Sequence, residues 1–207
     1  GYVSHTHGTG RWNGVAILTK SKVVDVTKDL VNQPLYEGAV EPRAIACTFK
    51  DIRVWNIYVP NGREPNHEHF SYKLQWLKAL KDTIAHELSE YQQLVVMGDF
   101  NIAPTDDDVW DIKDFENSTH VTEEERTALQ EILALGLSDI QPRSLKGKPF
   151  TFWDYRSLMF QKAMGMRIDL VLTTNQFASR ISDIWIDRDE RKAKGGSDHA
   201  PVVVDFE

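Results

Sequence analysis

The segment Leu94-Val95-Val96-Met97-Gly98-Asp99-Phe100-Asn101 decides the fold class, because an apolar run ends there in polar groups. The run predicts a buried strand, and Asp99 stands where that strand ends. Side chains two positions apart share one face of a strand, so we expect Asp99 and Asn101 to point into one site. A carboxylate in this position can coordinate a hard cation or take a proton from water. Asp and Asn are also ordinary turn residues, which is the alternative interpretation.

Short apolar runs on both sides of this segment predict further strands. The pair Lys50-Asp51 separates two of these runs and indicates a hairpin. We expect the strands at Val15–Leu18, Ala44–Phe49, Val54–Val59, Leu94–Met97, Phe150–Tyr155, Ile168–Leu172, Ile181–Ile186 and Val202–Phe206.

Two stretches with apolar residues at three- and four-residue steps predict helices. The first runs from about Asn66 to Glu90, and its first residue can act as the N-cap. The second runs from about Thr122 to Leu135, where Thr122 and Glu125 form a capping box and Gly136 ends the helix. Many strands with helices to cover them indicate two packed sheets in one α/β domain that spans residues 1–207.

Composition limits the choice of compartment and partner. The formal net charge of −7 argues weakly against a nucleic-acid binder, although basic residues gather at 143–148 and 188–194. The single cysteine, Cys47, lies in an apolar run, so we expect a buried thiol and a cytoplasmic protein, in a bacterial cytoplasm. No run approaches the roughly 18 apolar residues of a membrane helix, so we expect no membrane partner.

A second acidic residue, Asp169, interrupts the apolar strand of Met166-Arg167-Ile168-Asp169-Leu170-Val171-Leu172. A buried carboxylate without a partner is costly, so we expect one. A histidine is a natural partner, because the carboxylate fixes its tautomer and favours its protonated form. The neighbouring Arg167 is the alternative partner.

Two further segments carry polar groups that suit phosphate chemistry. In Gly195-Gly196-Ser197-Asp198-His199-Ala200-Pro201, Asp198 suits a Mg²⁺ ligand and His199 suits a donor to a phosphate oxygen. In the strand before Pro60, Tyr58 can donate to a reacting phosphate, or it can simply cap a core strand. With no nucleophilic Ser or Cys triad and no Walker loop, these groups together favour metal-assisted hydrolysis.

Taken in order, five segments resemble those of exodeoxyribonuclease III and its apurinic/apyrimidinic endonuclease relatives, within the endonuclease/exonuclease/phosphatase superfamily. Gly-Asp-Phe-Asn and Ser-Asp-His mark only the superfamily, whereas Ala-Pro-Thr-Asp and Trp-Asp-Tyr-Arg narrow the resemblance to the repair nucleases. The segments are Tyr58-Val59-Pro60-Asn61-Gly62, 98–101 with Ala103-Pro104-Thr105-Asp106, Thr151-Phe152-Trp153-Asp154-Tyr155-Arg156, 167–169 and 197–201.

The resemblance implies a four-layer α/β/β/α sandwich with two packed mixed sheets, and cleavage that depends on Mg²⁺ or Mn²⁺. The substrate it implies is double-stranded DNA with abasic sites or 3′ ends, cut 5′ to the abasic site with 3′→5′ exonuclease and 3′-phosphatase activities. We expect a monomer. Alternative substrates are a phospholipid or a small phosphate ester.

The resemblance also assigns roles to particular residues. Asp99 would activate the water or protonate the leaving oxygen, and Asn101 would stabilise the transition state. Asp169 would orient His199, which would bind a phosphate oxygen, while Tyr58 would assist at the phosphate. The implied metal site comprises Asp198, Asp99, Asn101 and His199, and the implied DNA contacts are Asn61, Phe152, Met166 and Ile168.

The sequence departs from the family in two places. Met166 stands where some relatives have Trp, so the wall of the pocket for the extruded abasic sugar is softer here. The family also opens with an Asn-bearing strand and then a Gln-Glu-Thr-Lys-like segment whose Glu is a principal metal ligand, and neither is found in these 207 residues. We therefore expect a sheet without its first strands. A third hypothesis follows, in which this chain binds DNA or a partner without hydrolysing it.

Overall fold

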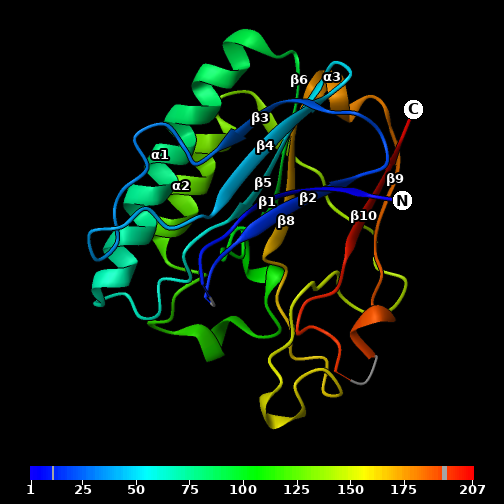
Figure 1. Cartoon of the computed structure of the whole chain (residues 1–207). Helices are drawn as coiled ribbons and strands as arrows, with labels where there is room; N and C mark the ends of the chain where they lie inside the picture. The colour runs from blue at the N-terminus through cyan, green and yellow to red at the C-terminus, as the bar shows by residue number, and fades with distance from the viewer. Residues whose placement is uncertain (11, 193–194) are drawn as a thin grey trace.

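The computed structural model describes residues 1–10, 12–192 and 195–207, so the end of the second basic run, Ala193 and Lys194, lies outside the described residues. A mixed sheet of six strands forms its centre, in the order β3-β4-β5-β6-β8-β7 (Figure 1). β5 and β6 pair in parallel, and the other neighbours described in this sheet run antiparallel. The strands are β3 (Val24–Lys28), β4 (Ala44–Phe49), β5 (Ile52–Tyr58), β6 (Gln93–Asp99), β7 (Leu137–Asp139) and β8 (Asp169–Thr174).

Two long helices, α1 (Glu68–Glu90) and α2 (Glu123–Leu133), cover one face of this sheet (Figure 1). The apolar stripe of α1 packs with β4, β5, β6 and β8 into the largest core of the molecule. α1 connects β5 to β6, which explains how two strands that follow one another can run parallel. The predicted capping box of α2 is confirmed, whereas α1 begins later than expected and is capped by His67, whose Nδ1 accepts from the His69 amide at 3.0 Å.

The opposite face of the sheet carries a second β layer made of two hairpins (Figure 1). One pairs β1 (Val3–His7) with β2 (Val15–Thr19), and the other pairs β9 (Ile181–Ile186) with β10 (Val202–Phe206). A separate apolar cluster, which includes Val95, Val171 and Ile184, joins the second hairpin to the sheet. The expected mixed α/β class with packed β layers is therefore confirmed. The remaining helical turns are α3 (Asn175–Ala178), η1 (Asp106–Asp108), η2 (Ile112–Phe115), η3 (Arg156–Leu158) and η4 (Glu190–Lys192).

The predicted strand at Phe150–Tyr155 is wrong, because this segment makes isolated bridges to two different partners. Phe152 bridges to Met166 on one side and to His199 on the other, and the Trp153 amide donates to the Asp198 carbonyl at 2.9 Å. The segment thus ties the approach to β8 to the loop before β10. It does not extend a sheet, and its apolar side chains serve to join the two β layers.

Cys47 is a free, buried cysteine in β4, as expected, and burial raises the pKa of its thiol. Among the helices that the structure describes, none combines the length and the apolar character needed to cross a membrane.

Candidate active site

The candidate active site begins as a row of residues across three neighbouring strands. Tyr58 on β5 lies in register with Asp99 on β6, and Asp99 lies in register with Asp169 on β8. Tyr58 and Asp99 are the last residues of β5 and β6, and Asp169 is the first residue of β8. Paired strands are about 4.8 Å apart, so the three side chains are close neighbours because of backbone pairing alone.

Asn101 joins this row through a turn of the backbone. Its φ of 51° is in the left-handed region, which folds the chain back on Asp99. The Asn101 amide nitrogen lies 2.8 Å from Asp99 Oδ1, and its side-chain Nδ2 lies 2.9 Å from Asp99 Oδ2. The two residues therefore meet as predicted, but through this turn and not through the alternation of a strand.

Gly98 is required at the end of β6 because two strands approach closely there. Its φ is 134°, and a Cβ at this position would overlap the carbonyl oxygen of Ile57. A larger residue would push β6 away from β5. The glycine of the Gly-Asp-Phe-Asn motif thus holds Asp99 beside Tyr58.

Two residues from the segment after β5 lie around Asn101. The exposed Asn61 donates from Nδ2 to Asn101 Oδ1 at 3.1 Å. Tyr58 is half-buried, and the guanidinium carbon of Arg43 lies 4.7 Å from the centre of its ring. The guanidinium thus lies over the face of the ring, the geometry of a cation–π contact.

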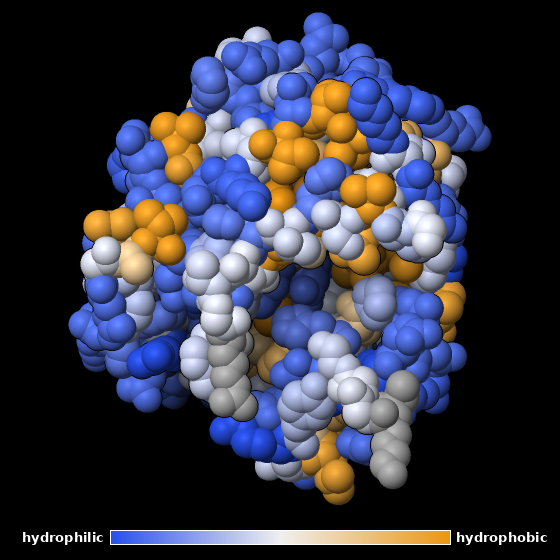
Figure 2. All heavy atoms as spheres, in the orientation of Figure 1, coloured by the Kyte–Doolittle hydropathy of each residue, from blue (hydrophilic) through white to orange (hydrophobic). Residues whose placement is uncertain are grey.

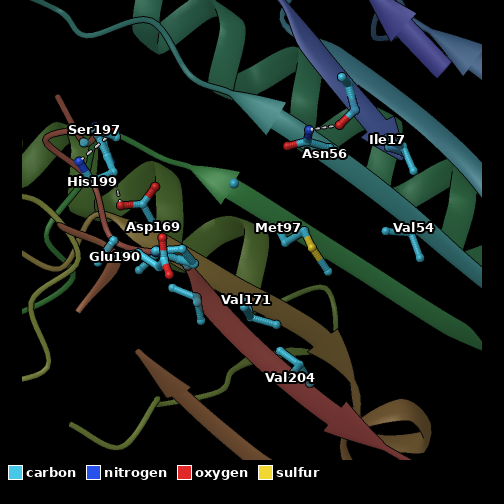
Figure 3. Close-up of a pocket in the computed structure, with 17 residues that line it drawn as sticks. Ile17, Val54, Asn56, Met97, Asp169, Val171, Glu190, Ser197, His199 and Val204 are labelled. Atoms are coloured by element: carbon cyan, nitrogen blue, oxygen red, sulfur yellow. Dashed lines mark hydrogen bonds and ion pairs between the residues drawn. The ribbon is translucent and has the colours of Figure 1, made fainter. Parts of the chain in front are cut away.

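His199 pairs with Asp169, as the sequence indicated. Nδ1 of the imidazole lies 2.9 Å from Asp169 Oδ2 (Figure 3). Burial works against a charged imidazole, but the hydrogen bond and the charge of Asp169 outweigh it and raise the pKa of His199 to about 9. His199 is therefore an imidazolium at neutral pH, with Nε2–H as a second donor. Arg167, the alternative partner, instead forms buried ion pairs with Asp108 and Asp139.

For Asp99, in contrast, the surroundings disfavour the charged form of the side chain. Burial, and then the negative charge of Asp169, raise the pKa of Asp99 to about 7, although His199 and the Asn101 amide oppose this. A carboxylate with such a pKa can hold or release a proton near neutral pH, which suits a general base or acid.

The predicted metal ligands are only partly assembled. Asp99, Asn101 and Asp198 offer the carboxylate and amide oxygens that hard cations prefer. Asp198 is close enough for its charge to raise the pKa of His199. However, within the described residues no group of three or more His, Cys, Asp or Glu side chains is placed to hold a metal ion. The donors present suit Mg²⁺ that keeps several waters and phosphate oxygens among its ligands.

The three other predicted DNA contacts form one wall next to His199. The Phe152 ring lies 4.9 Å from the His199 ring and is partly exposed. Met166 and Ile168 are buried beneath it in an apolar cluster with Val109. Phe152 thus faces the site, whereas Met166 and Ile168 support it from behind.

An apolar cleft of about 680 Å³ opens from the site between β2 and β10. Asp169 and His199 lie at one end, and Val54, Met97 and Val204 lie along it (Figure 3). Figure 2 shows the hollow on this face of the molecule, with apolar side chains along its rim. The acidic and imidazole groups therefore meet solvent at the edge of an apolar surface.

A family model described as "Endonuclease/Exonuclease/phosphatase family" matches residues 1–199. The chain belongs to this family. Curated relatives include an exodeoxyribonuclease from Bacillus subtilis, 29% identical over 93% of this chain and 74% of its own length. Another is exodeoxyribonuclease III from Haemophilus influenzae, 29% identical over 100% of this chain and 81% of its own length. The chain thus lies in the exodeoxyribonuclease III branch of the endonuclease/exonuclease/phosphatase family, as the motifs indicated.

Solved structures agree with this family assignment. The 3′ phosphatase NExo from Neisseria, bound to a product DNA hairpin, superposes with a TM-score of 0.94 at 36% identity, over 100% of this chain and 80% of that one. An AP endonuclease from Archaeoglobus fulgidus superposes with a TM-score of 0.90 at 33% identity, also over 100% of this chain and 80% of that one.

The sequence did not single out a buried polar group beneath Asn101. Lys73 on α1 is fully buried and donates to the Asn101 carbonyl at 2.7 Å. A lysine within the apolar stripe of a helix, four residues before Leu77, is the signal that could have drawn attention to it. Its partner Glu125 was noticed only as part of the capping box of α2.

Proposed function

We propose that this chain is the catalytic domain of a DNA-repair nuclease that hydrolyses phosphate esters by metal-assisted attack of water. The observation that carries the proposal is the row of Tyr58, Asp99 and Asp169 with His199 paired to its end. In this row a carboxylate lies beside a phenol, and an imidazolium is close enough for its charge to act on that carboxylate. Such an arrangement suits activation of water at a phosphate.

Each residue then has a distinct part. Asp99 takes the proton from the attacking water or returns one to the leaving oxygen, which its pKa of about 7 permits. His199 donates from Nε2 to a phosphate oxygen, while Asp169 holds the ring in orientation. Asn101 and Tyr58 are placed to stabilise the charge that develops on the phosphate oxygens.

A divalent cation, Mg²⁺ or Mn²⁺, is part of the proposal. Asp198, Asp99 and Asn101 would supply its oxygen ligands, whereas His199, the fourth residue expected there, would lie beside it as a donor to a phosphate oxygen. The cation would supply charge that stabilises the phosphate oxygens when bound. Within the described residues no group of three or more His, Cys, Asp or Glu side chains is gathered to hold a metal, so we also propose that this chain binds metal weakly and reacts slowly.

Double-stranded DNA is the proposed substrate, because the relatives include an AP endonuclease and a 3′ phosphatase bound to a DNA hairpin. We propose incision 5′ to abasic sites, 3′→5′ exonuclease action and 3′-phosphate removal. Phe152 would contact the extruded sugar, supported by Met166 and Ile168, and Asn61 would contact the strand. We further propose a monomer that works in the bacterial cytoplasm.

A single-turnover experiment tests this proposal, because slow chemistry is then still visible. An excess of the chain is mixed with duplexes that carry a 3′-phosphate or an abasic site, in millimolar Mg²⁺ or Mn²⁺. We expect slow product formation that stops on addition of chelator. His199→Ala should reduce the rate about 10²–10⁴-fold. His86→Ala, on the exposed side of α1, is the matched control.

Two results would contradict the proposal. One is a complete lack of reaction with both duplexes at every metal concentration. The other is a His199→Ala variant that reacts as fast as the control. Hydrolysis of phospholipid or small phosphate esters, with DNA left intact, would favour the alternative substrates.

A further inference from the structure

We propose that Lys73 is a positioning residue, which holds the main-chain carbonyl groups of Asn61 and Asn101 in place beneath the active site. The inference rests on the proposed phosphodiesterase function, because it concerns how that site is held. Lys73 comes from α1, outside the motif segments, and neither its side chain nor that of its partner Glu125 has any exposed area. A buried charge is costly, so its position calls for an explanation.

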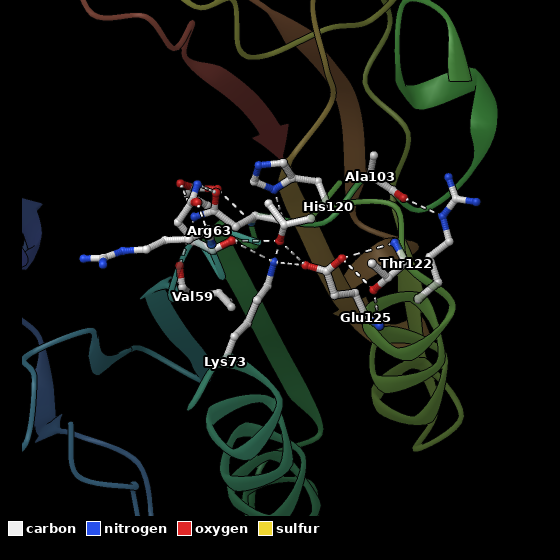
Figure 4. A network of polar contacts seen from close by, with 12 residues as sticks. Val59, Arg63, Lys73, Ala103, His120, Thr122 and Glu125 are labelled. Atoms are coloured by element: carbon white, nitrogen blue, oxygen red, sulfur yellow. Dashed lines mark hydrogen bonds and ion pairs between the residues drawn. The ribbon is translucent and has the colours of Figure 1, made fainter. Parts of the chain in front are cut away.

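The ammonium group of Lys73 makes three contacts, which match its three donors. It donates to the carbonyl oxygen of Asn101 at 2.7 Å and lies 3.4 Å from that of Asn61. The third contact is an ion pair with Oε1 of Glu125 on α2 (Figure 4). One buried cation thus connects two helices to two of the loops that carry site residues.

The carbonyl of Asn101 has a second donor on its other side. Nδ1 of His120 lies 2.6 Å from the same oxygen (Figure 4). A carbonyl oxygen can only accept a hydrogen bond, so the ring carries a proton on Nδ1 and donates it to this oxygen. Both lone pairs of the carbonyl are therefore occupied, and the peptide group cannot rotate without losing two buried hydrogen bonds.

This anchoring matters because the backbone conformation of Asn101 decides where its side chain lies. Its φ is 51°, and this turn brings its side chain to Asp99. A change of a few tens of degrees in the Asn101 backbone would remove Nδ2 from the Asp99 carboxylate. Lys73 thus contacts the backbone of Asn101, and the side chain of Asn101 in turn contacts Asp99 in the site.

The loop that contains Asn61 packs against the same lysine. Gly62 has a φ of 90°, and a Cβ there would lie 2.6 Å from Thr119 Oγ1 and 3.1 Å from Lys73 Cδ. The Thr119 hydroxyl itself lies 3.0 Å from the Asn61 carbonyl and 2.7 Å from Glu125 Oε1. The glycine of the Pro-Asn-Gly turn thus allows the loop to rest directly on the lysine stem.

Glu125 also caps α2, and this second contact fixes the orientation of its carboxylate. Its Oε2 accepts from the Thr122 amide at 3.2 Å in the capping box of α2, while Oε1 faces Lys73 and Thr119. The start of α2 is thereby coupled to the position of the lysine. A purely structural ion pair would need neither the two loop carbonyls nor the close fit at Gly62.

The test uses variants of the whole chain that keep the volume of the buried side chains. Lys73→Met alone would leave Glu125 buried and unpaired, so the main variant is Lys73→Met/Glu125→Gln, which removes both charges. Lys78→Met is the matched control, because Lys78 lies on the same helix with 71% of its side chain exposed and pairs with Asp82. Thr119→Val is a milder variant for use if the double variant does not fold.

The first measurement does not depend on activity. In ¹⁵N-labelled protein, we expect the side-chain amide signals of Asn101 and Asn61 to shift or broaden in the double variant and not in Lys78→Met. In Thr119→Val, the Asn61 signal should move more than that of Asn101. Unchanged asparagine signals in a folded double variant would overturn the inference, whether or not the wild-type chain cleaves DNA.

The second measurement separates positioning from general loss of stability. For 3′-phosphate release in single turnover, we expect the double variant to lower the chemical rate about 100-fold, since misplacement by about 1 Å has this effect. Its dissociation constant for DNA should change much less than the chemical rate, because Asn61 is the one proposed DNA contact that Lys73 touches. Leu80→Ala, a core substitution in α1, provides a destabilised control with an intact network.

An equal loss of rate in Leu80→Ala, or an unchanged rate in the double variant, would overturn the inference. If the wild-type chain releases no phosphate, the proposed function fails and the amide signals alone decide this inference.

Discussion

Nδ1 of His199 lies 2.9 Å from a carboxylate oxygen of Asp169, and this pair joins the loop before β10 to the first residue of β8. The contact links the two β layers of the molecule at the site itself. It also makes the charge of His199 depend on a residue in the central sheet.

The pair predicts an unusual titration for His199. In the presence of a chelator, an NMR titration of the His199 imidazole should give a pKa of about 9. In Asp169→Asn it should fall towards the ordinary 6.5. Because the folded pKa is raised, the stabilisation from the pair is complete below pH 6.5 and is lost as pH rises through 9. The unfolding free energies of wild type and Asp169→Asn should therefore converge above pH 9. Titration near 6.5 in both proteins would contradict the geometry.

Gly98→Ala should be strongly destabilising. The new Cβ would overlap the Ile57 carbonyl in a backbone conformation with φ of 134°. We expect a loss of unfolding free energy on the order of 3 kcal/mol or more in urea denaturation. Gly147→Ala is the control, because its φ is also positive, at 76°, but nothing lies within 4 Å of its Cβ position. A cost of about 1–2 kcal/mol is expected there. Equal losses would mean that the close approach of β5 to β6 is unimportant.

Arg167→Met should also destabilise the fold. The Arg167 side chain is fully buried, with Nε 2.7 Å from Asp108 Oδ1 and Nη2 2.8 Å from Asp139 Oδ2. Its removal leaves two buried carboxylates, so we expect a loss of about 3–5 kcal/mol in urea denaturation. Arg156→Met, which removes a side chain that is 86% exposed and pairs with Asp154, should cost about 1 kcal/mol or less. A loss as small as that of Arg156→Met would show that water reaches the buried carboxylates.

Asp198→Asn should weaken metal binding. We expect the affinity for Mn²⁺, measured by electron paramagnetic resonance of the free ion, to fall about tenfold or more, because carboxylate charge sets the affinity for hard cations. Asp107→Asn is the control, since the side chain of Asp107 is fully exposed and 3.9 Å from Lys148. Equal affinities in the two variants would remove Asp198 from the metal site.

The part of the site that the sequence predicted consists of groups at strand ends. Asp99, Asp169 and His199 stand beside apolar runs, so their place in the fold follows from where those runs begin and end. Tyr58 is found for the same reason. The pairing between strands then brings them together without further information.

The rest depends on contacts that sequence patterns do not record. The left-handed turn at Asn101 is set by Lys73 and His120, which come from distant parts of the chain. The capping box by itself accounts for a glutamate at position 125, so the sequence carries no signal for the second partner of Glu125. The edge strands β1, β3 and β7 are short and carry few buried residues, which removes the periodic signal that predicts a strand.

The shared register of Tyr58, Asp99 and Asp169 has a consequence for how the protein matures. β5, β6 and β8 are separated along the chain by a long helix and by about 70 residues, so their pairing is non-local and is expected to form late in folding. A partly folded chain could contain both helices and the β4–β5 hairpin and still have no functional site. The site would then form in the step in which β8 pairs with β6. During refolding, the recovery of activity should therefore lag behind the recovery of helix content.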